Sequence, residues 1–560
     1  MSDEKSAAVS YEESLLESAQ TEGLVGKALI YTRLSGPGWL QGAITLGGGS
    51  LAGALYLGVL MGTEMMWLQP LAMILGVIML SAISYVTLST GERPFQTIKT
   101  QISPVLAWGW LIATMMANIV WCLPQFALGT GAIQQNLVPA LDTDTGKKVV
   151  AFSLLAVASV VVWFYNSGSK GIKAFELILK AMVGVVVLSF FGVVIALTSQ
   201  DAVVWGDIFG GLVPNFSYLF KPVPALAEQI SLTGDYSQWW SSKIVGEQKN
   251  VIIAAFATAV GINMTFLLPY SMLRKGWGVK QRGLAIFDLS IGLIVPFVLA
   301  TGCVVIAAAT QFHGSTDDVI AKVQAGKVDS AEVKAYHKFL DERLVQADPQ
   351  LQLSELGPTD LDALRQGLPQ ADKNVAAMLV KRDNNALAGT LQPLVGSTVA
   401  QTVFGVGVLG MAVSTIIILM LINGFAFCEL LNVPAEGTMH RIGSFIPAIG
   451  VVGPFVWKEA APALAVPTSV IGGAMLPIAY VSFLLLMNSR SVLGEAMPTG
   501  ARRVVWNTLM IFGTGIASFA SAWGLYGRMW GDFPIGTAAL AALAIMLVLG
   551  VYSFLAKQKQ

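Results

Sequence analysis

The chain has 560 residues, of which 54% are hydrophobic and only 12% are charged, and its formal net charge is zero. A soluble protein of this length normally has about a quarter of its residues charged. The composition and the apolar runs of about 20 residues therefore exclude an ordinary soluble protein and predict an all-α integral membrane protein. The balanced charge gives no indication of a nucleic-acid partner.

Residues 1–35 form a polar, acidic segment without the basic-then-apolar pattern of a signal peptide. We expect a cytosolic N-terminal tail. The three cysteines, Cys122, Cys303 and Cys428, all lie in apolar segments and show no CxxC spacing. They are expected to be small core residues rather than disulfide partners or metal ligands.

Twelve apolar segments follow, and each must cross the bilayer as a helix because unpaired backbone groups find no water there. The ninth segment is short and rich in Pro and Gly. The predicted spans are Trp39–Leu60, Met66–Leu88, Pro104–Ile133, Val149–Tyr165, Phe175–Thr198, Val251–Leu273, Leu284–Thr310, Leu394–Ile422, Ile442–Val456, Ala463–Met487, Val504–Tyr526 and Ile535–Leu555.

The positive charges of the short connections predict the orientation, because cytoplasmic loops carry the excess of Lys and Arg. The poorer set of connections has only Lys147, Lys148, Lys458 and Arg528. We therefore expect the richer set, and with it both termini, to be cytoplasmic, in a bacterial plasma (inner) membrane. That richer set contains Arg93, Lys99, Lys170, Lys173, Arg274, Lys275, Lys280, Arg282, Arg441, Arg490, Arg502 and Arg503.

Two polar stretches then face outward, and they divide the chain. Residues 36–313 hold the first seven spans with an extracellular loop at 199–250, residues 314–392 form a polar insertion, and residues 393–560 hold the last five spans. Within the insertion, the sequence DSAEVKAYHKFLDERLVQ predicts an amphipathic helix capped by Asp329 or Ser330. The insertion is expected to be a small extracellular helical cap, and the alternative is a lid over the transport path or a docking site.

The first span contains the run Gly47, Gly48, Gly49 and Ser50 in the middle of the membrane. Each glycine costs a helix about 1 kcal/mol relative to alanine. Such a segment can unwind and expose backbone groups to a cavity, which lipid itself would not permit. Close helix packing is the alternative explanation of the glycines.

The sixth span has an interruption of its own at Pro269, which removes a helix hydrogen bond and clashes with the preceding turn. Asn263, Thr265 and Tyr270 place polar atoms nearby. Spans one and six open successive groups of five spans, and one starts inside while the other starts outside. Paired broken helices in two such inverted repeats predict a transporter with its binding site at the membrane midplane.

Several segments resemble the NRAMP family of proton-coupled divalent metal transporters. The first span has GPG, eight residues and then GGGS, where the family has GP(A/G), eight residues and then Asp-Pro-Gly-Asn. MLSAISYVTLSTGERPFQTI, VPFVLATGCVVIAAATQFH and MLPIAYVSFLLLMNSRSVLGEAMPTGARRVVWNTLMI resemble the second, seventh and tenth spans of the family. The resemblance implies a LeuT-type fold with two inverted five-helix repeats plus two C-terminal helices, and a substrate bound between helices one and six.

The family's ligand side chains are absent from the matching positions. Its metal-binding Asp and Asn fall on Gly47 and Ser50, and its Met-Pro-His falls on Leu268, Pro269 and Tyr270 if the proline is the anchor. The acidic residues of its proton path fall near Cys122 and Gln125. Without carboxylate, thioether and imidazole, we expect neither selective binding of Mn²⁺ or Fe²⁺ in the family's manner nor proton coupling by the family's residues.

We therefore expect a secondary transporter that moves a cation by alternating access. The favoured cation is Mg²⁺, which keeps its water, as in a magnesium-transporting branch of the family that also lacks the standard ligands. Ser50, Asn263 and Tyr270 would contact it through that water. The alternatives are an organic solute such as an amino acid, whose carboxylate the glycine-rich half-helix would bind, and a sensor without transport. We expect no enzyme activity and no cofactor, and the partners are the transported solute and the lipid bilayer.

Overall fold

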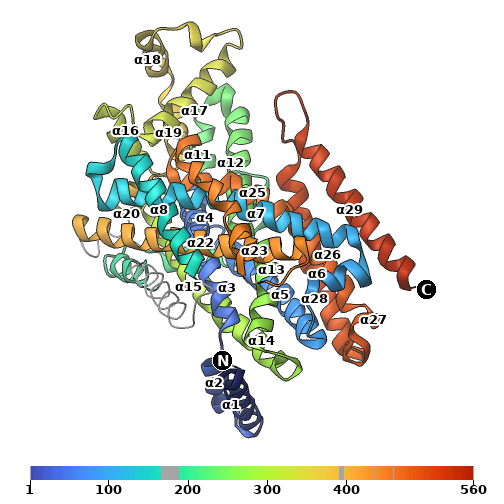
Figure 1. The fold of residues 1–560 in the computed structure, drawn as a ribbon. Coiled ribbons are helices and arrows are strands. Elements are labelled where there is room, and N and C mark those ends of the chain that lie inside the picture. The colour runs from blue at the N-terminus through green and yellow to red at the C-terminus, as the bar shows by residue number, and fades with distance from the viewer. Residues whose placement is uncertain are drawn as a thin grey trace.

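The structure is a computed structural model that describes residues 2–164, 184, 188, 190–389, 392, 396–435, 437–457 and 459–558. Within these residues the chain is helical, and the only strand-like feature is an isolated bridge between Trp530 and Phe533. Two N-terminal helices, α1 (Ser2–Thr21) and α2 (Leu24–Leu34), project from one end of the helix bundle. The insertion covers the opposite end (Figure 1).

Ten helical segments of the described residues are long and apolar enough to cross a membrane, and a bent pair makes eleven. The bent pair is α3 (Pro37–Thr45) with α4 (Gly48–Met61). The other spans consist of α5 (Leu68–Thr90), α7 (Pro104–Gly131), α8 (Asp144–Phe164), α12 (Ser237–Ala257) with α13 (Ile262–Lys275), α14 (Arg282–Leu289) with α15 (Val295–Phe312), α22 (Ser397–Leu431), α23 (Gly437–Ser444) with α24 (Gly453–Val456), α25 (Ala465–Ala474) with α26 (Leu476–Met487), α28 (Gly500–Leu525) and α29 (Ile535–Gln558).

Eleven of the twelve predicted spans thus have a described counterpart, although the sixth begins earlier and the eighth ends later than predicted. Most of the fifth, Phe175–Thr198, lies outside the described residues, and its described end belongs to the helix Phe190–Ser199. The weak ninth span is a succession of short turns, in which the 3-10 segment Ile446–Val452 separates α23 from α24. Its prolines account for this, because each removes a helix hydrogen bond.

The sixth span begins earlier than its apolar sequence predicts. Helix α12 starts at Ser237, so residues 237–250 belong to the helix and not to the outer loop predicted at 199–250. Trp240 in this polar first part is fully buried and donates its indole N–H to Asp372 of the insertion. The insertion therefore covers the polar first part of α12, which the sequence of α12 alone predicts to be an exposed loop. The rest of the loop holds α10 (Trp205–Gly211) and α11 (Pro224–Ser231).

The insertion is a small helical unit, as predicted. The expected amphipathic helix is α17 (Ala331–Ala347), and the Ser330 hydroxyl accepts a hydrogen bond from the Val333 amide as its N-terminal cap. Around it lie α16 (Asp317–Gln324), α18 (Pro358–Gly367), α19 (Gln370–Leu379) and α20 (Asn384–Gly389). Arg343 of α17 and Asp372 of α19 form a buried ion pair with a distance of 2.8 Å between Nε and Oδ1.

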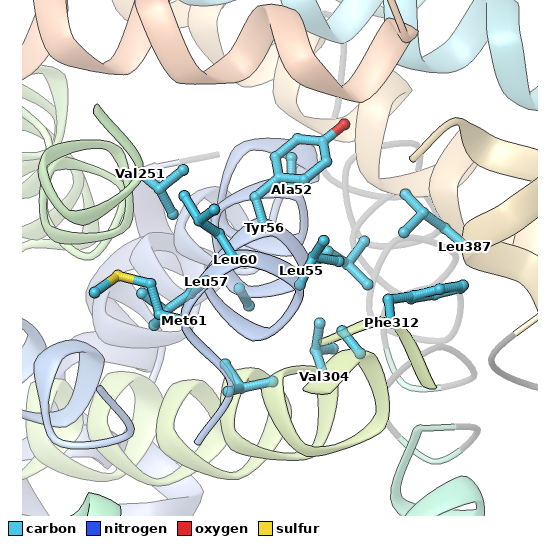
Figure 2. Packing of buried hydrophobic residues seen from close by; sticks show 14 of the residues in the cluster. Ala52, Leu55, Tyr56, Leu57, Leu60, Met61, Val251, Val304, Phe312 and Leu387 are labelled. Carbon is cyan, nitrogen blue, oxygen red and sulfur yellow. The ribbon is translucent and has the colours of Figure 1, made fainter. Parts of the chain in front are cut away.

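Helix α4 is the centre of the apolar core. All of its residues except Gly49 are buried, and nearly all of those after Ser50 are apolar. A helix that is apolar on every side needs neighbours on every side. Figure 2 shows its side chains between Val251 of α12, Val304 of α15 and Leu387 of α20. The outer half of the first span is therefore enclosed by both the transmembrane bundle and the insertion.

The buried ion pair gives a test of how the insertion is held together. Asp372→Ala leaves the Arg343 guanidinium buried without its carboxylate, so we expect a loss of about 3–5 kcal/mol of stability in the insertion. Asp362→Ala is the control, because Asp362 lies in an exposed pair with Arg365 and should change stability by less than about 1 kcal/mol. Thermal unfolding in detergent, followed by tryptophan fluorescence, measures both. Equal melting temperatures of the two variants would contradict the assignment.

Candidate functional site

The first span is broken where the glycine run predicts it, although the break is shorter than the run. Helices α3 and α4 meet at an angle of 50°. Leu46 and Gly47 form the junction, and Gly48, Gly49 and Ser50 already belong to the first turn of α4. The predicted unwinding is therefore limited to the first glycine of the run, because Gly48 and Gly49 are helical.

The sixth span is broken at a different place from the one predicted. Helix α12 ends at Ala257 and α13 begins at Ile262, whereas Pro269 lies inside α13. At Gly261, a side chain would meet the ring of Trp121 at 2.5 Å, so the closeness of α7 requires glycine there. The break therefore depends on a neighbour that is distant in sequence, and the proline is accommodated in a continuing helix.

The two breaks contact each other directly. The Ser50 hydroxyl donates to the Thr258 carbonyl with a distance of 3.1 Å between Oγ and O. The Thr45 hydroxyl lies 3.4 Å from the Ala259 carbonyl oxygen and 3.3 Å from the Met264 sulfur. Carbonyl groups released by the sixth span thus find their partners on the first span, as non-helical backbone at membrane depth requires.

A cavity of about 50 Å³ lies at this junction. Of the nine predicted site residues, Gly49, Ser50 and Asn263 line it. None of its described lining residues carries a charged side chain. The lining residues are Ile44, Gly49, Ser50, Trp121, Pro124, Gln125, Ala257, Thr258, Gly261, Asn263, Met264, Thr415, Leu419, Ala465 and Ser469.

The other predicted site residues lie elsewhere. Gly47 lines a separate apolar cavity of about 30 Å³, and Gly48 packs against α7. Thr265 accepts a hydrogen bond from the Trp110 indole, and Tyr270 stacks on Phe266. Leu268, Pro269 and Tyr270 are buried farther along α13, outside the residues that line the cavity. When the family's Met-Pro-His motif is aligned on Pro269, its first residue falls on Leu268. Leu268 lies about one helical turn after Met264, the residue of α13 that lines the cavity.

Three lining residues that sequence reasoning did not assign to the site come from neighbouring helices. Gln125 of α7 is 3% exposed, and its Oε1 atom has no hydrogen-bond partner. Thr415 of α22 donates its hydroxyl to Met411, which leaves the oxygen lone pairs available. Met264 of α13 brings a thioether, so the predicted absence of a thioether at the site is wrong. Sequence reasoning placed Gln125 only near the acidic residues of the family's proton path; a polar side chain in an apolar segment, a feature that it shares with Asn118 of α7, was the signal that could have indicated it.

The electrostatics of the site come from backbone dipoles. The carbonyl ends of α3 and α12 and the amide ends of α4 and α13 meet at the two breaks. Helix C-termini carry partial negative charge and N-termini partial positive charge. Ile44, Ala257 and Thr258 near the carbonyl ends line the cavity, and so do Gly49 and Asn263 near the amide ends. Oxygen acceptors from Gln125, Ser50 and Thr415 surround the same space.

The end of α3 away from the cavity is fixed by a carboxylate. The backbone amides of Gly36 and Gly38 donate to the two oxygens of Asp288 of α14 at 3.2 and 2.6 Å. Asp288 is 1% exposed, so its carboxylate is enclosed by protein and bound by these amides. A side chain at Gly42 would lie 2.6 Å from the Gly292 carbonyl oxygen, so α3 packs on the seventh span without space between the backbones.

Comparison with known proteins identifies the family. A family model described as natural resistance-associated macrophage protein-like (Nramp) matches residues 38–342 and 374–523. The chain belongs to the Nramp family. It is therefore an integral membrane transporter of a metal-transporting family, as the resemblance implied. No match was found among curated proteins.

Solved structures of a manganese transporter from Eremococcus coleocola have the same fold. One, in complex with an aromatic bis-isothiourea substituted compound, is 14% identical with a TM-score of 0.59 and covers 96% of this chain and 97% of that one. A point mutant of that transporter is also 14% identical, with a TM-score of 0.55 and 95% of each chain covered. The predicted LeuT-type fold is thereby confirmed, and identity this low supports the fold alone.

The contact of Gly48 with α7 gives a test of the site. A side chain there would meet Leu128 at 2.6 Å and Gln125 at 2.8 Å. Gly48→Leu should therefore displace Gln125 from the cavity and abolish uptake of the transported ion, while membrane insertion stays normal. Gly246→Leu is the control, because no atom lies within 4 Å of that position. Uptake assays on equal amounts of membrane-inserted protein measure the effect, and normal uptake by Gly48→Leu would remove the first helix from the site.

Proposed function

We propose that the chain is a secondary transporter that moves a divalent cation, Mg²⁺ kept partly hydrated, by alternating access through the cavity between the two breaks. The observation that carries this proposal is the set of neutral oxygen groups around a cavity without charged side chains. Family membership supports the divalent cation. The choice of Mg²⁺ among divalent cations rests on its reluctance to give up its bound water.

An ion in this cavity has no carboxylate to replace its hydration. A bare divalent cation would lose far more solvation than a few dipoles return. Mg²⁺ dehydrates reluctantly and usually keeps several waters in protein sites. The carbonyl ends of α3 and α12 and the oxygens of Gln125, Ser50 and Thr415 can accept hydrogen bonds from such waters. The cavity is thus better suited to a hydrated ion than to a bare one.

The size of the cavity sets how much water accompanies the ion in this conformation. A volume of 50 Å³ corresponds to about two waters at roughly 30 Å³ each. A complete shell of six waters does not fit, so side chains and backbone carbonyls must replace part of it. Ser50 and Asn263 remain in the proposed water-mediated contacts, and Gln125 takes the place predicted for Tyr270.

The Met264 sulfur is the feature that favours a softer ion such as Mn²⁺. A thioether is a soft ligand that selects transition metals. In this conformation the Thr45 hydroxyl donates a hydrogen bond to the Met264 sulfur, with a distance of 3.3 Å between Oγ1 and Sδ. A thioether used as a hydrogen-bond acceptor within the protein is less available to a metal ion. We therefore keep Mg²⁺ as the substrate and treat Mn²⁺ as the competitor to test.

An organic anion is the second candidate. The amide ends of α4 and α13 lie at the breaks, and the N-terminus of a half-helix binds carboxylates well. The volume of the cavity opposes it, because pockets for organic ligands usually have about 300 Å³ or more. A transport-inactive sensor is the remaining alternative, and flux alone excludes it.

The sidedness of the transporter follows from the positive charges of its connections. With the Lys- and Arg-rich set in the cytoplasm, the insertion faces outward and both termini face inward, in a bacterial plasma membrane. Asp288 and α3 then lie in the cytoplasmic half, and α4 with its cover of insertion residues lies in the outer half.

Flux in proteoliposomes tests the substrate. We expect uptake of Mg²⁺ that Mn²⁺ inhibits weakly, and no uptake or current with a panel of amino acids. Saturable flux of an amino acid would replace the proposal by its second candidate. The absence of flux for every solute, in liposomes that carry a second transporter as a control for sealing, would leave the sensor as the function.

Gln125 gives a test of the water-mediated site. Gln125→Leu removes the unpartnered Oε1 atom, and a hydrogen bond to an ion's water is worth about one to two kcal/mol. We expect KM for Mg²⁺ to rise about tenfold with little change in folding. Gln69→Leu is the matched control, because Gln69 is also a buried glutamine but does not line the cavity. An unchanged KM in Gln125→Leu would exclude this contact.

Met264 gives the test that separates the two metals. Met264→Leu keeps the volume but removes the sulfur, so Mg²⁺ uptake should keep its KM within about twofold, as expected for an isosteric apolar exchange. Any residual Mn²⁺ uptake should also be unaffected. A selective loss of Mn²⁺ uptake in this variant would show that the sulfur binds the ion, and the proposal of Mg²⁺ would then fail.

A further inference from the structure

A large cavity lies between the insertion and the end of α7 that faces it. Its volume is about 840 Å³, and its wall includes Ala127 and Gly131 of α7 and Ala461, just before α25. The small cavity between the two breaks is lined by Gln125 of α7 and Ala465 of α25. Two residues of a helix span roughly 3 Å, so the two cavities adjoin along α7 and the start of α25. The larger one is called the outer cavity below.

Two buried acidic residues of the insertion line the outer cavity. Glu332 of α17 is fully buried, and Asp383, just before α20, is 8% exposed. They are neighbours, because one Glu332 oxygen accepts a hydrogen bond from the Asp383 amide at 3.1 Å. The Lys322 ammonium donates to the same oxygen at 2.6 Å. The other Glu332 oxygen has no hydrogen-bond partner, and no ion pair of the described residues includes Asp383.

The other charged groups nearby have partners of their own or face water. The ion pairs are Lys334–Asp329, Lys338–Glu459 and Arg382–Asp318. The remaining charged residues of the wall, which are partly or largely exposed, are Asp142, Lys147 and Lys327. Water and salt screen exposed charges much more than buried ones. The two buried carboxylates are therefore balanced by the single charge of Lys322, and one negative charge is left over.

The residue after Asp383 connects the acidic pair to the wall that the two cavities share. Asn384 is fully buried, and its side-chain amide donates to the Leu128 carbonyl of α7 at 3.4 Å. A side chain at Gly131 would lie 2.8 Å from the same amide nitrogen. Leu128 follows Gln125 by about one helical turn. The acidic pair thus lies next to the part of α7 that borders the small cavity.

We propose that Glu332 and Asp383 form an outer site that binds a hydrated divalent cation in place of the Lys322 ammonium. The inference rests on the proposed function and deepens it, because the site lies beside the cavity through which the ion is moved. Among the described residues, no group of three or more His, Cys, Asp or Glu could hold a metal ion, so the two carboxylates bind the ion through its waters. Six waters occupy roughly 180 Å³ at about 30 Å³ each, which the 840 Å³ of the outer cavity accommodate.

The Lys322 side chain makes this exchange possible. It lines the outer cavity and is 23% exposed, so its ammonium can turn into water when an ion arrives. The two carboxylates then carry two negative charges, which one divalent cation balances. A monovalent cation would leave one buried negative charge uncompensated, as Lys322 itself does, and such a charge is costly. The site therefore selects a double charge, and the second Glu332 oxygen gains a partner among the waters of the ion.

Isothermal titration calorimetry with Mg²⁺ on the full chain, in nanodiscs of neutral lipid at constant pH, tests the site. Asp383→Asn keeps the shape of the side chain but removes one charge of the pair. A contact with a charged group is worth about a factor of ten or more, and we expect the dissociation constant of one class of sites to rise by that factor. Gln125→Leu should weaken a different class, because Gln125 lines the small cavity. Asp362→Asn is the matched control, because this exposed acid of the insertion does not line the outer cavity.

Lys322→Met keeps the test decisive if Asp383→Asn folds poorly. It removes the competing ammonium, so Mg²⁺ should bind about tenfold more tightly, which a misfolded protein cannot do. Equal Mg²⁺ affinities of the native chain, Asp383→Asn and Lys322→Met would overturn the site. Flux of the native chain in proteoliposomes separates this result from a failure of the proposed function. Flux together with equal affinities removes the outer site alone, whereas the expected changes in affinity without any flux remove transport and leave the site.

Discussion

Backbone groups that leave helical form inside a membrane must find partners within the protein, and this constraint determines the centre of the molecule. The first span provides hydroxyl groups at Thr45 and Ser50, and the sixth provides carbonyl groups at Thr258 and Ala259. Neither broken helix could be solvated by lipid alone. Ser50 and Thr258 thus hold the two spans together and also line the cavity, so the same contact supports the fold and the candidate site.

The neutral character of the cavity follows from this arrangement. Helix ends of both signs meet at the breaks, and amide and hydroxyl side chains from α7 and α22 complete the wall. Such a wall can exchange hydrogen bonds with water more easily than it can replace water entirely. Buried charged side chains are found in the insertion, where Arg343 pairs with Asp372, Arg382 with Asp318 and Glu332 with Lys322. Buried ion pairs are thus found in the insertion, whereas the wall of the cavity has no charged side chain.

The sequence allowed much of the fold to be predicted, because apolar segments in a membrane leave few alternatives to helices. The first break was predictable from three consecutive glycines, which weaken a helix wherever they occur. The second was not, because a side chain at Gly261 would meet the ring of Trp121 on another helix as well as the nearby Asn263. Pro269 was misleading for the complementary reason, since a helix can continue through a proline when tertiary packing holds it. Gln125 shows the same limit, as its role depends on which helix faces the cavity.

The attachment of α3 to Asp288 has a mechanical consequence. Two backbone amides are bound by one carboxylate, and the glycine contact at Gly42 leaves no gap in which the helices could slide. Helix α3 and the start of the seventh span must then rotate as a single rigid lever. Any change in the angle of the first span is concentrated in Leu46 and Gly47, the only non-helical residues between α3 and α4. A hinge at these two residues would therefore lie beside the cavity, since Gly47 adjoins the lining residues of α4.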